Sequence, residues 1–208
     1  MAKGGIFIAG TGTGVGKTYV CGFLANYLKY ARKKKILYYK PIQCGHPADI
    51  DLIKKLAKLK HKDAYCSYNL KTPSSPHFAF AKEQIKFEKK NVKNFLSAAK
   101  KQYDLIIMEG AGGLRVPIAH NFDMADLAKL SKFPVLLVAL PGLGTINHTL
   151  LSIDYLKSKN IEIFGFVFSP AKYIDKLNEE IILDNAKTIE NISGVSYKGN
   201  AMPLPFIP

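Results

Sequence analysis

Short apolar runs alternate along the chain with longer segments in which apolar residues recur every three or four positions. The short runs predict buried strands, and the longer segments predict amphipathic helices. The expected strands span residues 6–9, 36–39, 105–108, 135–140 and 161–168. The expected helices span residues 18–31, 50–59, 91–101, 123–131, 145–159 and 173–191. This alternation indicates an α/β fold with a doubly wound, mostly parallel sheet and helices on both faces.

Two segments do not fit this alternation. Residues 63–87 are irregular and rich in Pro and Ser, and residues 202–208 hold three prolines, which excludes a central strand there. Neither segment is a linker that would divide the chain. We therefore expect residues 1–208 to form a single domain.

The first strand is followed by a glycine-rich loop, residues 10–18, which reads Gly-Thr-Gly-Thr-Gly-Val-Gly-Lys-Thr. A strand, such a loop and a Gly-Lys-Thr that opens a helix are typical of a P-loop, whose backbone N–H groups converge on phosphate oxygens. Lys17 is expected to reach the β- and γ-phosphates, and the hydroxyl of Thr18 to bind Mg²⁺. The expected nucleotide-binding residues are Gly14, Val15, Gly16, Lys17, Thr18 and Tyr19.

The spacing within this loop is unusual. Five residues separate Gly10 from Gly16, one more than in the common P-loop pattern. Partition and septum-site ATPases carry a second lysine at the position of Gly12, which this chain lacks.

The strand expected at residues 105–108 ends in an acid and a glycine cluster, Glu109 to Gly113. An acid at the carboxyl end of a parallel strand beside the P-loop strand can bind Mg²⁺ or its water. Gly110, Ala111 and Gly112 would let the backbone approach the γ-phosphate. Lys40, followed by Pro41, is expected to end the second strand and to point into the same crevice. A second lysine beside Lys17 suits phosphoryl transfer, which needs fixed positive charge.

The formal net charge is +14. Most lysines are scattered at helical spacing, and the one tight run, residues 32–35, has no RNA-binding aromatic motif beside it. We therefore expect small anionic substrates and no nucleic acid. No apolar run is long enough to span a membrane, no secretory signal is seen, and the three cysteines match neither a disulfide framework nor a zinc pattern. These features predict a cytoplasmic protein.

Taken together, the motifs resemble those of the dethiobiotin synthase family over roughly three quarters of the chain. The matching segments are residues 10–18, 40–45 (Lys-Pro-Ile-Gln-Cys-Gly), 74–77 (Ser-Ser-Pro-His), 109–113 (Glu-Gly-Ala-Gly-Gly) and 142–148 (Gly-Leu-Gly-Thr-Ile-Asn-His). The resemblance implies a ligase that uses ATP, Mg²⁺ and CO₂ to close 7,8-diaminononanoate into a cyclic urea. It also implies a homodimer with the site at its interface.

The resemblance also implies site residues. The catalytic positions are Lys40, Lys17 and Thr13, and the metal ligands are Thr18, Glu109 and an aspartate after the second strand. The substrate-binding positions are Cys44, Gly144 and Asn147, and Pro203, Leu204 and Pro205 would flank the adenine.

The metal aspartate is Asp49 or Asp51. The family's acid precedes a helix with apolar residues about four and seven positions later. Ile53 and Leu56 meet that pattern for Asp49, whereas Asp51 would place lysines there. We choose Asp49, which would also suit a helix N-cap.

The chain departs from the family's sequence pattern at two motifs. Cys44 stands where the family usually has Ser or Thr, so it is either a weak hydrogen-bond partner of the substrate or a small buried filler. Ser169-Pro170 replaces the Asn-Asp that reads adenine. Two rival functions stay open, a P-loop ATPase switch of the partition or septum-site type and another ATP-dependent ligase of the same fold.

Overall fold

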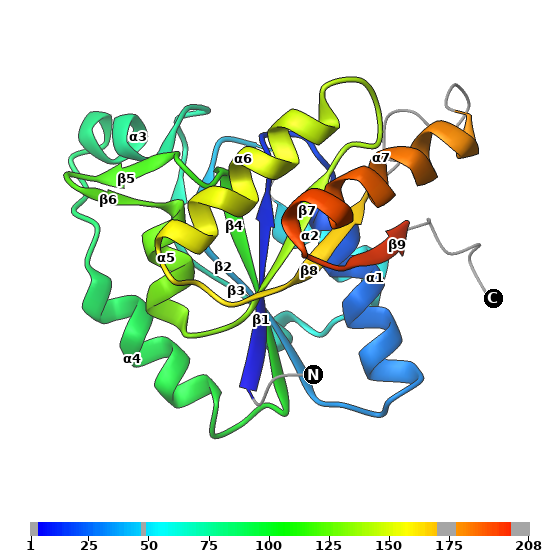
Figure 1. Ribbon diagram of the computed structural model, residues 1–208. Helices are drawn as coiled ribbons and strands as arrows, with labels where there is room; N and C mark the ends of the chain where they lie inside the picture. The colour runs from blue at the N-terminus through cyan, green and yellow to red at the C-terminus, as the bar shows by residue number, and fades with distance from the viewer. Residues whose placement is uncertain (1–3, 47–48, 170–177, 201–208) are drawn as a thin grey trace.

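The computed structural model describes residues 4–46, 49–169 and 178–200. Its centre is a sheet of seven strands in the order β3-β2-β4-β1-β7-β8-β9, in which all neighbouring strands run parallel (Figure 1). The strands are β1 (Gly4–Gly10), β2 (Ile36–Cys44), β3 (Ala64–Leu70), β4 (Leu105–Gly113), β7 (Val135–Ala139), β8 (Ile163–Phe168) and β9 (Tyr197–Asn200). The predicted α/β class and parallel sheet are thus confirmed.

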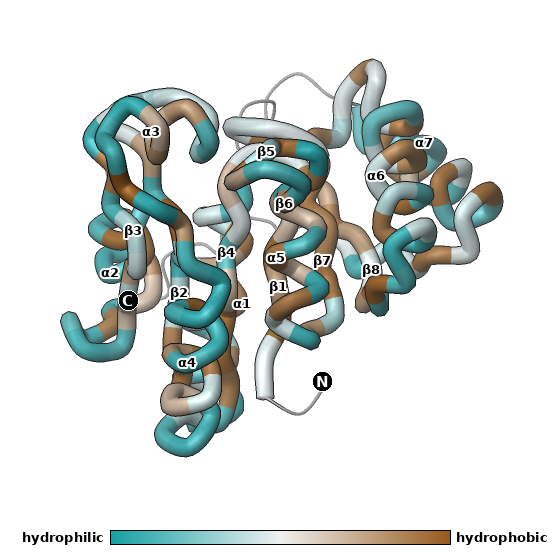
Figure 2. The backbone as a smooth tube through the Cα atoms, turned by 90° about the vertical axis from the view of Figure 1, so that its left-hand side faces the viewer, coloured by the Kyte–Doolittle hydropathy of each residue, from teal (hydrophilic) through white to brown (hydrophobic). Residues whose placement is uncertain are grey.

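Helices cover both faces of this sheet because its strands are apolar on both sides. Ile6 and Ile8 of β1 pack with α1 and α2, whereas Phe7 and Ala9 belong to the core on the opposite face. The first face carries α1 (Lys17–Tyr30) and α2 (Asp49–Ala57); the second carries α3 (Pro76–Lys82), α4 (Lys89–Ala99), α5 (Met124–Ser131), α6 (Thr145–Ser158) and α7 (Glu179–Ser193). Figure 2 shows the same layering, with hydrophobic colour along β1 and β7 and mostly hydrophilic colour along α4. In the described part of the chain, no helix combines the length and apolar character needed to cross a membrane.

Several elements were not predicted. A short 3₁₀ turn, η1 (His61–Asp63), leads into the irregular segment 63–87, which contains β3 and α3. A small antiparallel hairpin, β5 (Pro117–Ala119) with β6 (Phe122–Asp123), follows β4. β3 lies at the sheet edge, and between its buried end residues, Ala64 and Leu70, its residues are exposed or half-buried, so it lacks the continuous apolar run of a central strand. Of the last predicted helix, residues 179–193 are helical; residues 173–177, and the tail 202–208, lie outside the described residues.

The second strand does not end at Lys40-Pro41, as predicted, but continues to Cys44. Its pairing with β4 stops at Tyr39, so no ladder on that side is interrupted by a proline. On the other side, the ladder with β3 passes over Pro41 and resumes at Ile42. Lys40 is therefore held in the middle of a strand.

Candidate active site

The predicted phosphate loop lies where β1 ends and α1 begins. Gly14 and Gly16 have φ angles of +72° and +93°, which side chains disfavour. A side chain at Gly10 would meet Val15 Cγ2 at 2.8 Å and Lys17 Nζ at 3.0 Å. The glycines thus allow the loop to fold tightly onto the helix N-terminus, where backbone N–H groups favour anions.

Lys17, the P-loop lysine, is buried and donates a hydrogen bond from Nζ to the carbonyl oxygen of Gly12 at 2.9 Å. Burial lowers its pKa, Glu109 opposes this effect, and the nearby charge of Lys40 adds to it. The ammonium is therefore held in a place where a further negative charge, such as a phosphate, would be strongly favoured.

Glu109, on β4, is the centre of the site and is 1% exposed. Its Oε1 accepts hydrogen bonds from Thr18 Oγ1 at 2.9 Å and from Lys40 Nζ at 3.0 Å. Its Oε2 accepts one from the hydroxyl of Tyr38 at 2.8 Å. Burial alone would raise the pKa of Glu109, but Lys40 and Tyr38 lower it below its ordinary value. The carboxylate is therefore ionised.

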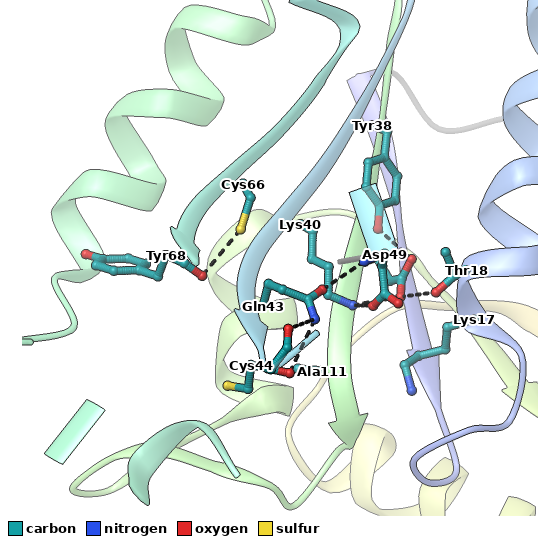
Figure 3. Close-up of polar contacts among 12 residues, drawn as sticks. Lys17, Thr18, Tyr38, Lys40, Gln43, Cys44, Asp49, Cys66, Tyr68 and Ala111 are labelled. Carbon is teal, nitrogen blue, oxygen red and sulfur yellow. Dashed lines mark hydrogen bonds and ion pairs between the residues drawn. The ribbon is translucent and has the colours of Figure 1, made fainter. Parts of the chain in front are cut away.

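Lys40 lies between two carboxylates, since its ammonium also forms a short ion pair with Asp49 (Figure 3). Burial would lower the pKa of Lys40, but Glu109 and Asp49 raise it above its ordinary value. Asp51 points elsewhere, because its side chain is 69% exposed and pairs with Lys54 at 3.6 Å. Of the two candidate aspartates, only Asp49 reaches the cluster.

Tyr38 was not predicted from the sequence, although a signal exists. Residues two apart in a strand face the same side of the sheet, so Tyr38 and Lys40 lie on one face. In the sheet, Tyr38 pairs with Ile107, two residues before Glu109. The parallel register therefore brings the tyrosine hydroxyl to the carboxylate.

The glycine cluster after Glu109 packs against the phosphate loop. Gly112 has a φ angle of +66°, and a side chain there would meet Val116 Cγ2 at 2.8 Å and Thr13 Oγ1 at 3.5 Å. The Ala111 N–H donates to Met124 Sδ at 3.4 Å, and a side chain at Gly110 would lie 3.2 Å from the ring of Phe7. The two predicted loops thus form one surface. Among the other predicted loop residues, Thr13 and Tyr19 are exposed and Val15 is buried.

The residues predicted to bind the organic substrate lie at the end of β2 and at the start of α6. Gly144, with a φ angle of +88°, caps α6, and Asn147 is exposed in the first turn of that helix. No hydrogen bond or ion pair within the described residues joins either of them to Lys40. Cys44 ends β2 and is half-buried, and burial raises the pKa of its thiol to about 11.

Two further predictions concern the nucleotide base. Ser169 directly follows β8 and is buried, and its N–H donates to the carbonyl of Ala139 at 2.8 Å. Pro170 and the predicted adenine-flanking residues Pro203, Leu204 and Pro205 lie outside the described residues.

The donor set around Lys40 fits a magnesium ion. The Asp49 and Glu109 carboxylates already contact one cation, the Lys40 ammonium, and the Thr18 hydroxyl is hydrogen-bonded to Glu109 beside them. Mg²⁺ prefers such oxygen ligands and completes its shell with waters and substrate phosphates. Among the described residues, no group of three or more His, Cys, Asp or Glu is placed to hold a metal ion, so nucleotide phosphates and water would have to complete the shell.

Comparison with known proteins identifies a family model and several proteins that are similar to this chain. A family model described as an AAA domain matches residues 4–201. The ATP-dependent dethiobiotin synthetase BioD of Methanocaldococcus jannaschii is 37% identical over 200 residues, covering 93% of this chain and 92% of that protein. The protein of the same name from Fusobacterium nucleatum is 38% identical, covering 91% and 87%.

Solved structures share the fold at much lower identity. Cyanthece apo McdA has a TM-score of 0.61 at 14% identity, covering 93% of this chain and 83% of that one. The septum site-determining protein MinD of Pyrococcus horikoshii, solved with Mg-ADP, has a TM-score of 0.56 at 17% identity, covering 88% and 77%. At such identities the likeness extends to the fold alone.

Proposed function

This chain belongs to the family of ATP-dependent dethiobiotin synthetases, and we propose that it makes dethiobiotin from 7,8-diaminononanoate, CO₂ and ATP. The observation that carries this proposal is the second buried lysine. Lys40 is 4% exposed and stands beside the P-loop cluster. Binding a nucleotide needs the charge of Lys17, whereas joining a second anion to the γ-phosphate needs more positive charge than one lysine supplies.

The reaction requires no protein nucleophile. One amine of the diamine adds to CO₂ and loses a proton, which gives a carbamate. A carbamate oxygen then attacks the γ-phosphorus of ATP, and ADP leaves. The second amine attacks the carbamate carbon of this mixed anhydride, the ring closes, and phosphate leaves with the second proton released to solvent. The protein contributes positioning and electrostatic stabilisation of the anions.

Roles for the residues follow from their positions. Lys17 and the N–H groups of the phosphate loop would bind the nucleotide, while Thr18, Asp49 and Glu109 would hold Mg²⁺. Mg²⁺ held there would neutralise part of the phosphate charge. Thr13, packed against Gly112, would contact the γ-phosphate.

In the resting structure Lys40 pairs with the proposed metal ligands, and in the reaction we assign it a different partner. Its ammonium contacts the same carboxylate oxygens that Mg²⁺ would need. A metal ion and an ammonium that share these oxygens would repel each other at close range. We therefore propose that Lys40 loosens its contacts with Asp49 and Glu109 when the metal-nucleotide complex binds, and we assign its ammonium to the carbamate and the γ-phosphate.

The finer features rest on the family resemblance. We propose a homodimer in which Gly144 and Asn147 bind the substrate carboxylate across the interface, with Cys44 on the chain's own side. This fits the exposure of Gly144 and Asn147. We propose one ligase domain over residues 1–208, acting in the cytoplasm.

A P-loop ATPase switch of the partition or septum-site type is the rival function, and the solved structures above share its fold. Position 12 is Gly, where those ATPases have a second lysine, and Lys40 is present; both features argue against a switch. A different ligase of the same fold would use the same nucleotide site, so the organic substrate must decide.

The test is to incubate the protein with ATP, Mg²⁺, bicarbonate and 7,8-diaminononanoate, and to measure the cyclic urea by mass spectrometry and ADP in parallel. We expect one ADP per cyclic urea and little ADP without the diamine. ADP release at the same rate with and without the diamine, with no cyclic urea, would favour the switch.

A further inference from the structure

Gln43 is a buried polar residue that none of the roles above uses. It lies near the end of β2 in the Lys-Pro-Ile-Gln-Cys-Gly segment and is 7% exposed. A buried side-chain amide without partners would be costly, so its hydrogen bonds indicate why it is there.

The Gln43 amide joins β2 to the start of α2 (Figure 3). Its Oε1 accepts a hydrogen bond from the backbone N–H of Asp49 at 3.2 Å. Its Nε2 donates to the carbonyl oxygens of Cys44 at 3.3 Å and Gly45 at 3.2 Å. A flipped amide would set its NH₂ against the Asp49 N–H and its oxygen against two carbonyls, so these partners fix its orientation.

The hydrogen bond to the Asp49 N–H satisfies a group at the start of α2, because Asp49 is the first residue of that helix. The first N–H groups of a helix have no acceptor within the helix. Gln43 supplies one of these acceptors from the strand that also carries Lys40. The start of α2, and with it the Asp49 carboxylate, is thereby tied to β2.

We infer that Gln43 is a positioning residue, which sets the affinity of the site for Mg²⁺ by holding Asp49 in place. The inference rests on the proposed role of Asp49 as a metal ligand. Side chains that orient metal ligands commonly change metal affinity by about 10- to 100-fold when they are replaced.

The test is a double-mutant cycle on Gln43→Met and Asp49→Asn. Methionine has a similar length but makes no amide hydrogen bonds; Gln43→Leu serves as a second variant if Gln43→Met does not fold. Mn²⁺ binding in the presence of ADP is measured by the electron paramagnetic resonance signal of free Mn²⁺. Gln102→Leu, at an exposed glutamine, is the matched control.

We expect Gln43→Met to weaken Mn²⁺ binding about 10- to 100-fold, and Gln102→Leu to leave it unchanged. In the Asp49→Asn background, Gln43→Met should cause little further loss, because the residue that it positions is gone. Turnover of Gln43→Met should recover at saturating Mg²⁺, whereas general structural damage would lower turnover at every Mg²⁺ concentration.

Three results would overturn the inference: unchanged Mn²⁺ affinity in a folded Gln43 variant, the same fold-loss with and without Asp49, or no loss in Asp49→Asn itself. The proposed function is tested separately by cyclic urea formation in the unaltered protein. If that protein forms no cyclic urea while the cycle shows coupling between Gln43 and Asp49, the function fails and the positioning role stands.

Discussion

Lys40 and Glu109 form a buried ion pair, in which the ammonium nitrogen lies 3.0 Å from Oε1 and the two side chains are 5% and 1% exposed. Charges removed from water are stable only when they are paired, so neither residue can be changed without consequence for the other. In the proposed function, the same pair would join the metal ligands to the place that receives the organic substrate.

Replacing Lys40 by Gln should lower kcat by about 10²-fold or more, the effect of removing one preorganised electrostatic donor. Nucleotide affinity should change much less, because Lys17 and the loop N–H groups remain. Calorimetry with ATP and the rate of cyclic urea formation would measure the two effects. Equal losses in both would make Lys40 an ordinary phosphate contact, and no loss in either would remove its catalytic role.

The same variant should bind divalent metal more tightly when no nucleotide is present. The Lys40 ammonium contacts Asp49 and Glu109, so removing its charge removes a competitor of the metal. We expect Mn²⁺ affinity to rise at least about tenfold, which corresponds to about 1.4 kcal/mol. Lys54→Gln, at a lysine that pairs with Asp51 outside the cluster, should leave it unchanged. Weaker Mn²⁺ binding in Lys40→Gln would exclude the competition.

Asp49→Asn should raise the Mg²⁺ concentration needed for half-maximal activity far more than Asp51→Asn. Asp49 reaches the Lys40 cluster, whereas Asp51 lies on the exposed side of α2. A surface ion pair such as that of Asp51 contributes at most about 1 kcal/mol, so its loss should hardly affect the site. Magnesium titrations of the activity of both variants would measure this difference. A larger Mg²⁺ requirement in Asp51→Asn than in Asp49→Asn would assign the metal to Asp51.

Tyr38→Phe should make the protein more sensitive to acid. The depressed pKa of Glu109 means that its carboxylate stabilises the fold above the pKa it has when unfolded, and that this stabilisation is lost as pH falls through the lower folded pKa. Without the Tyr38 hydroxyl the folded pKa rises, so protonation and unfolding begin at higher pH. Leaving Oε2 of Glu109 without that donor should also cost about 1–3 kcal/mol of stability.

Circular dichroism during acid titration would measure this shift. Tyr39→Phe is the matched control, because Tyr39 is equally buried but its hydroxyl pairs with Ser67 at 2.7 Å on the other face of the sheet. Identical acid midpoints for Tyr38→Phe and Tyr39→Phe would contradict a specific role for the Tyr38 hydroxyl.

Cys44 should react slowly with iodoacetamide at neutral pH. Burial raises the pKa of its thiol from 9.0 to about 11, and only the thiolate is nucleophilic. At pH 8 its thiolate fraction should be about 100-fold smaller than that of an ordinary thiol. Peptide mass spectrometry of alkylation between pH 8 and 11.5, with a free cysteine peptide as reference, should place the midpoint near 11. A midpoint near 9 would mean an unperturbed thiol.

Much of this site could be predicted from the sequence because its signals are local. The P-loop spacing located Lys17 and Thr18, and an acid after an apolar run located Glu109. The helical pattern of the family favoured Asp49 over Asp51 as the metal ligand, and in the structure Asp49 is the one that pairs with Lys40. Each of these inferences needed only a few neighbouring residues.

The partners of these residues could not be predicted in the same way. The contact of Tyr38 with Glu109 depends on the register between β2 and β4, which joins residues far apart in the chain. Likewise, β3 owes its strand structure to pairing with β2 rather than to an apolar pattern of its own. Pro41 suggested the end of a strand, but a parallel ladder can pass over one proline when the other side is unpaired.

The course of β2 past Pro41 has a consequence for motion. At Tyr38 and Tyr39 the strand pairs with neighbours on both sides, whereas from Ile42 to Cys44 its ladder partner among the described strands is β3 alone, itself an edge strand. Amide protons in this second half should therefore exchange with solvent sooner than those of β1 and β4. β2 and β4 are no longer paired beyond Tyr39. We therefore expect the strand that carries the phosphate loop to be rigid, and the end of β2, with Gln43 and Cys44, to be more flexible.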